Sequence, residues 1–183
     1  TWASSTANPR GICFLTSLGT QNAAVSFGGM SGFTCTQFYD GTSWTAKNSL
    51  STGRYASGGI GTQNSALAIG GYCASVSNGY NVSCATVEEW DGTNWSSSQN
   101  LVIGVGGGNT AGTTNDTLMI GGAAPGYTVA SYNQSWDGTA WSMQQKLLAT
   151  AARLGSGGSG NAAIAAKGYT GFGTALWNVN PLG

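Results

Sequence analysis

Four short segments of the chain place apolar residues at every second position. The alternating positions are Val25/Phe27, Leu67/Ile69, Leu118/Ile120 and Ile164/Ala166. Because successive side chains of a strand point to opposite sides, this pattern predicts four β-strands with a buried face. The segments are followed by Gly28-Gly29, Gly70-Gly71, Gly121-Gly122 and Lys167-Gly168.

A second motif follows the first three of these strands. It reads Tyr39-Asp-Gly-Thr-Ser-Trp44, Trp90-Asp-Gly-Thr-Asn-Trp95 and Trp136-Asp-Gly-Thr-Ala-Trp141. Asp-Gly is a strong hairpin signal, since glycine accepts the positive φ that such a turn needs. The aromatic residue before each Asp-Gly therefore ends one strand, and the motif Trp begins the next strand.

The spacing of the motifs fixes the repeat. Twenty residues separate Trp44 from Asn64, and the same spacing joins Trp95–Asn115, Trp141–Asn161 and Trp2–Asn22. We therefore predict an all-β, four-bladed β-propeller of four-stranded antiparallel blades, in which the N-terminal strand with Trp2 closes the last blade. The chain is expected to be a single propeller domain over residues 1–183, with repeats at roughly 3–44, 45–95, 96–141, and 142–183 plus 1–2.

These motifs resemble the kelch repeat: an apolar strand ends in Gly-Gly, an aromatic residue follows, and a Trp comes a few residues later. The likeness covers nearly the whole chain, although the fourth repeat lacks one Gly of the pair and the Asp-Gly. The residues of these motifs are most similar to those of the kelch-like arrays of phage structural proteins and bacterial surface proteins. The resemblance implies a propeller with a structural or adhesive role. Kelch-like propellers usually have more blades, so closure by a second chain, or excision from a longer array, stays open.

Composition narrows the range of functions. Only 7% of the 183 residues are charged, six Lys and Arg balance six Asp and Glu, and His is absent. Without His there is no Ser-His-Asp or Cys-His nucleophile and no His-ligated metal. The few cations give no electrostatic footprint for nucleic acid, and no apolar run approaches the roughly 18 residues of a membrane span. We expect a non-enzymatic protein without cofactor or metal.

All of the variation in length lies in one connection of each repeat, between the second and third strands. The distance from the second Gly of each pair to the next turn ranges from 10 to 20 residues. In an up-and-down blade these connections share one face, and insertions on one face often mark a binding surface. The candidate binding residues are aromatic or amide side chains in these connections, suited to a glycan or a protein. They are Phe33, Tyr72, Asn78, Tyr80, Asn81, Tyr127, Tyr169 and Phe172.

The even number of cysteines suggests an oxidising compartment. Cys73 and Cys84 flank the longest connection, and Cys13 and Cys35 lie within one repeat, so we favour these two local disulfides among three pairings. Free thiols and a zinc site are the alternatives.

The Asp-Gly motifs place Asp40, Asp91 and Asp137 at equivalent turns. We interpret each Asp as capping its own turn through its side chain, with a ring of Ca²⁺ ligands as the alternative. A hydrolase would need facing carboxylates, and neighbouring strand residues such as Glu88 and Glu89 point to opposite faces. Hydrolysis through Glu89 and Arg54 is therefore a minor alternative.

The sequence thus predicts an extracellular, cell-surface or virion module that contacts a glycan or a protein, including a second copy of itself, through the irregular loops. Trp2, Trp44, Trp95 and Trp141 are expected to be structural residues of the repeat. A self-assembling subunit of a phage particle, filament or surface layer, and a multivalent lectin with one site per blade, are the alternatives. The partner, the source organism and the route of ring closure stay open.

Overall fold

The computed structural model describes residues 5–9, 13–74, 81–126, 128–166 and 174–178. Within these ranges the chain forms β-strands, all paired antiparallel, and no helix. The predicted all-β class is confirmed. No helix of the described residues could cross a membrane.

The strands of the first three repeats form one four-stranded sheet each, ordered from first to last along the chain. The first sheet contains β1 (Thr16–Thr20), β2 (Ala23–Phe27), β3 (Thr36–Tyr39) and β4 (Trp44–Lys47). The second contains β6 (Gly58–Gly61), β7 (Ala66–Ile69), β10 (Val87–Trp90) and β11 (Trp95–Ser97). The third contains β12 (Asn109–Thr113), β13 (Asp116–Ile120), β16 (Asn133–Trp136) and β17 (Trp141–Gln144). The fourth repeat shows three strands, β18 (Gly155–Gly158), β19 (Ala162–Ala166) and β20 (Thr174–Asn178).

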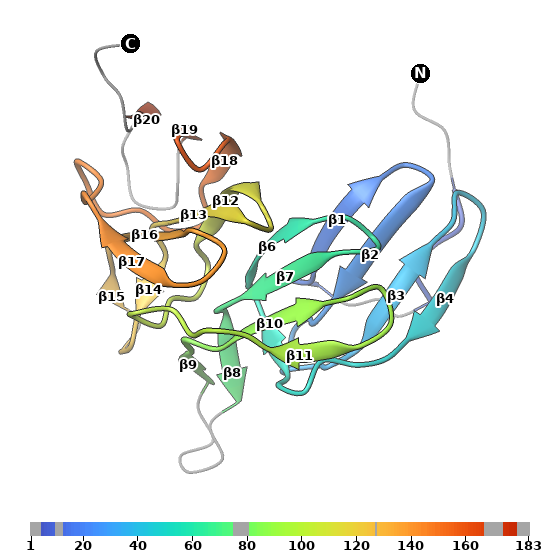
Figure 1. Cartoon of the computed structure of the whole chain (residues 1–183). Helices are drawn as coiled ribbons and strands as arrows, with labels where there is room; N and C mark the ends of the chain where they lie inside the picture. Colours follow the sequence, from blue (N-terminus) through green and yellow to red (C-terminus); the bar gives the residue numbers. More distant parts are fainter. Residues whose placement is uncertain (1–4, 10–12, 75–80, 127, 167–173, 179–183) are drawn as a thin grey trace.

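The first strands of successive sheets lie side by side. β1 neighbours β6, β6 neighbours β12, and β12 neighbours β18, so the four sheets follow one another along an arc (Figure 1). Among the described strands, β18 and β1 do not form a corresponding contact, and no closed ring is present. Trp2 lies outside the described residues, so its predicted place in the last sheet stays a prediction.

The described strands form six sheets rather than the predicted four, because the connecting segments also pair with one another. The two extra sheets are β5 (Arg54–Tyr55) with β8 (Tyr72–Ala74) and β9 (Asn81–Ser83), and β14 (Ala123–Ala124) with β15 (Thr128–Val129). Long connections leave many backbone groups without partners, and local pairing satisfies these groups.

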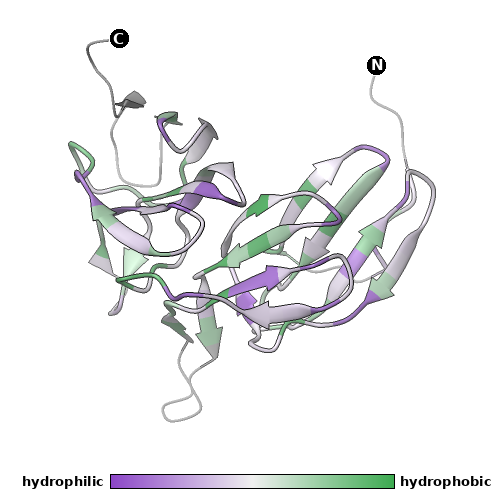
Figure 2. Cartoon of the chain, in the orientation of Figure 1, coloured by the Kyte–Doolittle hydropathy of each residue, from purple (hydrophilic) through white to green (hydrophobic). Residues whose placement is uncertain are grey.

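The core of the described chain lies between neighbouring sheets. One cluster joins Leu67 and Ile69 of the second sheet to Met119, Trp136 and Trp141 of the third. Similar clusters join the first sheet to the second and the third to the fourth. Figure 2 shows β7 hydrophobic along its length and β10 largely hydrophilic, although β10 also contributes Val87 to the core. The period-two alternation of the sequence therefore understates burial, since β7 is buried at every position.

Backbone geometry explains why glycine occupies both positions of each pair. Both glycines of each pair adopt positive φ, for example 58° at Gly70 and 100° at Gly71. The Gly71 N–H donates to the Val105 carbonyl of the next repeat at 2.8 Å. A Cβ on Gly70 would lie only 2.6 Å from the Val105 carbonyl oxygen. Glycine is required here because the backbone of the next repeat passes directly over the pair.

The glycine-rich segment before the third sheet is not part of its first strand. β12 begins only at Asn109. Gly106 instead forms an isolated bridge with Ala123 of the irregular connection. A Cβ on Gly106 would collide with the Tyr72 ring at 2.7 Å, so the small residues make room for the loop aromatics.

Candidate functional site

The irregular connections and the connections between sheets emerge at the same ends of the strands. We call this surface the loop face and define it, within the described residues, as 13–15, 28–35, 48–57, 70–74, 81–86, 98–108, 121–126, 128–132 and 145–154. Six of the eight exposed large hydrophobic side chains of the described chain belong to it. They are Phe14, Met30, Phe33, Val82, Val102 and Leu148. The other two, Met143 and Ile164, lie within strands.

An aromatic ladder, formed by Phe14, Tyr55 and Tyr72 with Arg153 at its end, crosses the loop face. Phe14 and Tyr55 have ring centroids 6.3 Å apart, and Tyr55 and Tyr72 are 5.1 Å apart. The Arg153 guanidinium carbon lies 5.7 Å from the centroid of the Phe14 ring, within the range of a cation–π contact. Phe14 is 44% exposed and Tyr72 only 8%, so the ladder runs from an accessible end to a buried end.

Four residues at equivalent positions in the repeats hold the ladder in place. Phe14, Ala56, Gly107 and Arg153 each stand 12 residues after the motif Trp of the preceding strand. All four adopt left-handed backbone conformations, with φ of 58°, 48°, 67° and 54°. The N–H of each of the last three donates to the carbonyl of the one before, at 2.9, 2.8 and 2.6 Å. This backbone relay places Phe14 and Arg153, from opposite ends of the chain, at the same site.

Three of these left-handed residues carry side chains that rarely adopt a positive φ. Such backbone strain costs of order 1–3 kcal/mol per residue, and the surrounding hydrogen bonds must maintain it. The backbone of each of these residues is hydrogen-bonded to that of a neighbouring repeat, which positions the Phe14 ring and the Arg153 guanidinium. The rings are tilted against one another, by 58° and 32° in the two pairs. A row of partly exposed rings with one cation is suited to packing against apolar faces of a ligand and to binding its acceptor groups.

The predicted loop residues differ in their exposure and position in the structure. Phe33 is 40% exposed, as expected of a contact residue. Tyr72 is buried, since it packs between Tyr55 and Gly106, and mainly supports the ladder rather than facing a partner. Asn81 begins β9. The other candidates lie outside the described residues; they are Asn78, Tyr80, Tyr127, Tyr169 and Phe172.

The cysteine prediction is half right. Cys73 and Cys84 form a disulfide, which joins β8 to the segment after β9. Cys13 and Cys35 are separate thiols, so the predicted second bridge is wrong. The Cys13 thiol is exposed and lies 3.5 Å from the Met30 sulfur, whereas Cys35 lines a small space beside β2. The two side chains are directed to different surroundings, although the residues share one repeat.

The equivalent aspartates hold their turns. Asp40 Oδ1 accepts the backbone N–H groups of Thr42 and Ser43 at 2.8 Å each. These bonds, that of Ser43 foremost, hold the pKa of Asp40 well below its usual range. Hydrogen bonds from Asn94 and from Thr139 foremost likewise lower the pKa of Asp91 and of Asp137. The described residues contain no group of three or more Cys, Asp or Glu placed to hold a metal ion.

The residues of the hydrolase alternative have other positions. The Arg54 guanidinium donates to Glu88 Oε1 at 2.6 Å, and both side chains are buried. Glu88 also accepts the N–H and hydroxyl of Ser51 at 2.7 and 2.8 Å. Glu89 is exposed on the middle of β10, paired with Leu67 and Ser96. Arg54 and Glu89 are therefore not brought together at a common surface.

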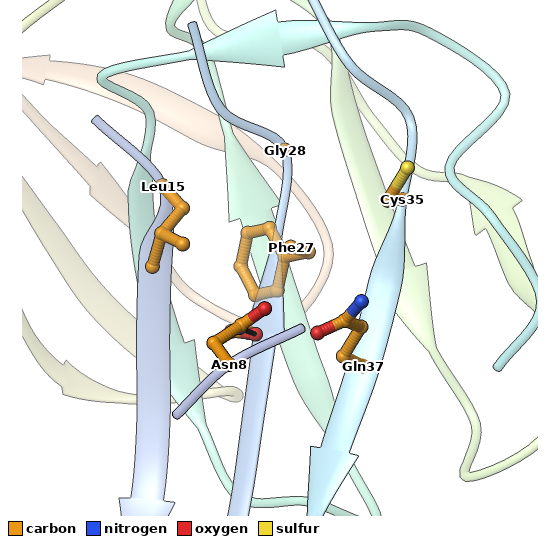
Figure 3. A pocket seen from close by; sticks show the side chains of 7 residues that line it. Asn8, Leu15, Phe27, Gly28, Cys35 and Gln37 are labelled. Atoms are coloured by element: carbon orange, nitrogen blue, oxygen red, sulfur yellow. Dashed lines mark hydrogen bonds between the residues drawn. The ribbon is translucent and has the colours of Figure 1, made fainter. Parts of the chain in front are cut away.

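A small cavity lies beside β2 and β3 (Figure 3). Its lining includes Asn8, Phe27, Cys35 and Gln37, and its volume is about 10 Å³. This volume is close to that of a single water molecule's probe sphere, so the cavity is too small for an organic ligand. The Gln37 side-chain oxygen is buried without a hydrogen-bond partner in the described structure.

Sequence reasoning missed Phe14, Tyr55 and Arg153. These residues lie in connections that lead into the first strand of a sheet. Such connections do not vary in length, so insertions in the sequence do not point to them. The available signal was variation in residue type: the two positions 11 and 12 residues after each motif Trp hold Cys13-Phe14, Tyr55-Ala56, Gly106-Gly107 and Ala152-Arg153.

Comparisons with known proteins identify the fold but no family. No family model matches the chain, and no curated protein matches it. A solved structure entitled "Structure of YjhT" is similar in fold, with a TM-score of 0.75 and 14% sequence identity. The match covers 90% of this chain and 60% of that structure, so the chain spans about three-fifths of the length of its neighbour.

Proposed function

We propose that this chain is a non-enzymatic contact module of an extracellular, cell or virion surface, and that it binds a glycan or a protein through the loop face. One observation carries the proposal: six of the eight exposed large hydrophobic side chains of the described residues belong to this face. Exposed apolar side chains that are concentrated on one face favour a contact role for that face.

The aromatic ladder is the proposed centre of the contact. Its rings offer large apolar surfaces that lose little side-chain entropy on binding, and Arg153 adds a donor of several hydrogen bonds. The Cys73–Cys84 disulfide supports an oxidising environment, as expected for an exported protein.

The ladder favours one site per chain over one site per repeat. Phe14 corresponds to Ala56, Gly107 and Arg153 in the other repeats, so the repeats do not share a side chain there. We therefore favour a module with a single binding site over a multivalent lectin.

We also propose that the sheets are blades of a β-propeller. The succession of neighbouring first strands supports this architecture. The N-terminal segment supports the register of Trp2: Thr6 donates to the Thr42 carbonyl just as Asn48, also four residues after a motif Trp, donates to the Thr93 carbonyl. Residues 5–8 thus contact the first sheet in the manner in which the segment after β4 contacts the second.

A glycan array probed with the fluorescently labelled chain tests the glycan form of this proposal. We expect selected oligosaccharides to be bound, Phe14→Ser and Phe33→Ser to lose that signal, and Met143→Ser to retain it. Met143 is a matched control because it is 38% exposed but lies on β17, outside the loop face. Each variant is checked for an unchanged unfolding midpoint. An array with no bound glycan would refute the glycan form, and equal loss with Met143→Ser would refute the assignment of the face.

A further inference from the structure

The last sheet exposes a position that every earlier sheet buries. The residues 23 positions after each motif Trp are Val25, Leu67, Leu118 and Ile164. The first three are 0%, 1% and 0% exposed, whereas Ile164 is 44% exposed. The strands are equivalent and the side chains are all aliphatic, so the difference comes from what covers them.

The cover is always the next sheet along the chain. Val25 shares a cluster with Ala68 of the second sheet, and Leu67 shares one with Met119 of the third. Leu118 shares one with Ala163 of the fourth. Ile164 belongs to none of the clusters of the described residues, because β19 is in the last sheet.

The matching cover exists at the other end of the same chain. A covering sheet contributes an aromatic pair from its outer hairpin. In the second sheet this pair is Trp90 and Trp95, with ring centroids 5.3 Å apart. Trp90 packs against Phe38 and Trp95 against Phe27, both in the first sheet. In the first sheet the equivalent pair is Tyr39 and Trp44, 5.0 Å apart. No earlier sheet stands before this pair in the described chain.

Within the described residues, the first and last sheets do not cover one another. β18 and β1 are not neighbours as the other first strands are, and Ile164 remains exposed. The first and fourth repeats do meet on the loop face, where the Arg153 guanidinium lies over the Phe14 ring. Among the described strands, β20 pairs with β19 alone, whereas β4, β11 and β17 each add a fourth strand to their sheets.

We propose that the flank of the last sheet, centred on Ile164, binds the first sheet of a second copy of this chain. The contact is head-to-tail: it uses two different surfaces, and repetition closes a ring of copies or extends a filament. It buries Ile164 as its three equivalents are buried. This proposal is independent of the loop face.

Light scattering after size exclusion, over a wide concentration range, gives the first test. We expect the wild-type mass to rise with concentration to multiples of the chain mass. Ile164→Glu should remain a monomer, because a carboxylate cannot enter the apolar contact. Met143→Glu, a similarly exposed strand position outside the flank, should associate like the wild type. A wild type that is monomeric throughout, or an Ile164→Glu variant that associates unchanged, would overturn the proposal.

Crosslinking separates contact between copies from closure within a chain. Ala24 is the equivalent of Ala163, which covers Leu118, so Ala24 is expected to approach Ile164 of another copy. In a Cys13→Ser/Cys35→Ser background, an Ala24→Cys population and an Ile164→Cys population are mixed and oxidised. We expect disulfide-linked dimers in the mixture and far fewer in either population alone. If one chain carrying both cysteines links only to itself, the ring is self-closed and the proposal fails.

Discussion

Replacing Glu88 by Gln is expected to destabilise the protein strongly, because it leaves the Arg54 charge buried without a counter-charge. Arg54 and Glu88 are 0% and 2% exposed, and their closest atoms are 2.6 Å apart. Burial lowers the pKa of Arg54, an effect that the neighbouring Glu88 carboxylate opposes. Removing one partner of a buried pair typically costs about 3–5 kcal/mol.

The third repeat provides the matched control. It carries Val105 and Gln134 at the positions of Arg54 and Glu88, and the Gln134 side chain accepts the Ile103 N–H at 3.0 Å and donates to the Ile103 carbonyl at 2.9 Å. An uncharged pair is therefore compatible with this fold. The double variant Arg54→Met/Glu88→Gln is expected to be more stable than Glu88→Gln alone.

The remaining loss in the double variant has a defined source. Arg54 donates to the carbonyls of Gly70 and Thr86 at 2.9 and 2.8 Å, and Met supplies no donor. At about 1 kcal/mol for each lost hydrogen bond, the double variant should lie about 2 kcal/mol below the wild type. The coupling free energy between the two sites should then exceed 1 kcal/mol.

Urea unfolding followed by tryptophan fluorescence measures these differences from the midpoint, provided the slope stays constant. Additive effects of Arg54→Met and Glu88→Gln would refute the reasoning, because they would mean that the two charges do not depend on one another.

The other predictions concern the turns, the paired glycines and the disulfide. Folding lowers the pKa of Asp40, so the ionised carboxylate stabilises the folded protein above the ordinary pKa near 3.8, and this stabilisation is lost as the pH falls below that value. Asn can still cap the turn but does not titrate. The urea midpoint of Asp40→Asn should therefore fall less between pH 5 and pH 2 than that of the wild type. Gly70→Ala should cost at least about 2 kcal/mol, since its Cβ meets the next repeat, whereas Gly157→Ala, with no atom within 4 Å of its Cβ, should change the midpoint little. The ring closed by Cys73 and Cys84 spans 11 residues, so Cys73→Ser/Cys84→Ser should lose about 3 kcal/mol. An unchanged thermal midpoint of that variant would contradict the chain-entropy account.

The sequence by itself determined the repeat and its strands. The positions of Gly-Gly, Asp-Gly and Trp are local signals, because turn geometry demands glycine and hairpins demand a particular spacing. The structure accordingly places one sheet in each of the first three repeats, with strands in the expected order, and places the equivalent aspartates in their turns. The prediction that Cys73 and Cys84 pair is also local, since the two residues flank one connection.

Only the tertiary structure decided which side chains share a surface. Phe14 and Arg153 stand at opposite ends of the sequence, and the backbone relay between successive sheets brings them together. Tyr72 looks like a loop residue in the sequence, but the glycine-rich segment at Gly106 accommodates its ring and buries it. Ile164 has the pattern of a core residue, yet it is exposed because burial in this fold is supplied by the next sheet rather than by its own.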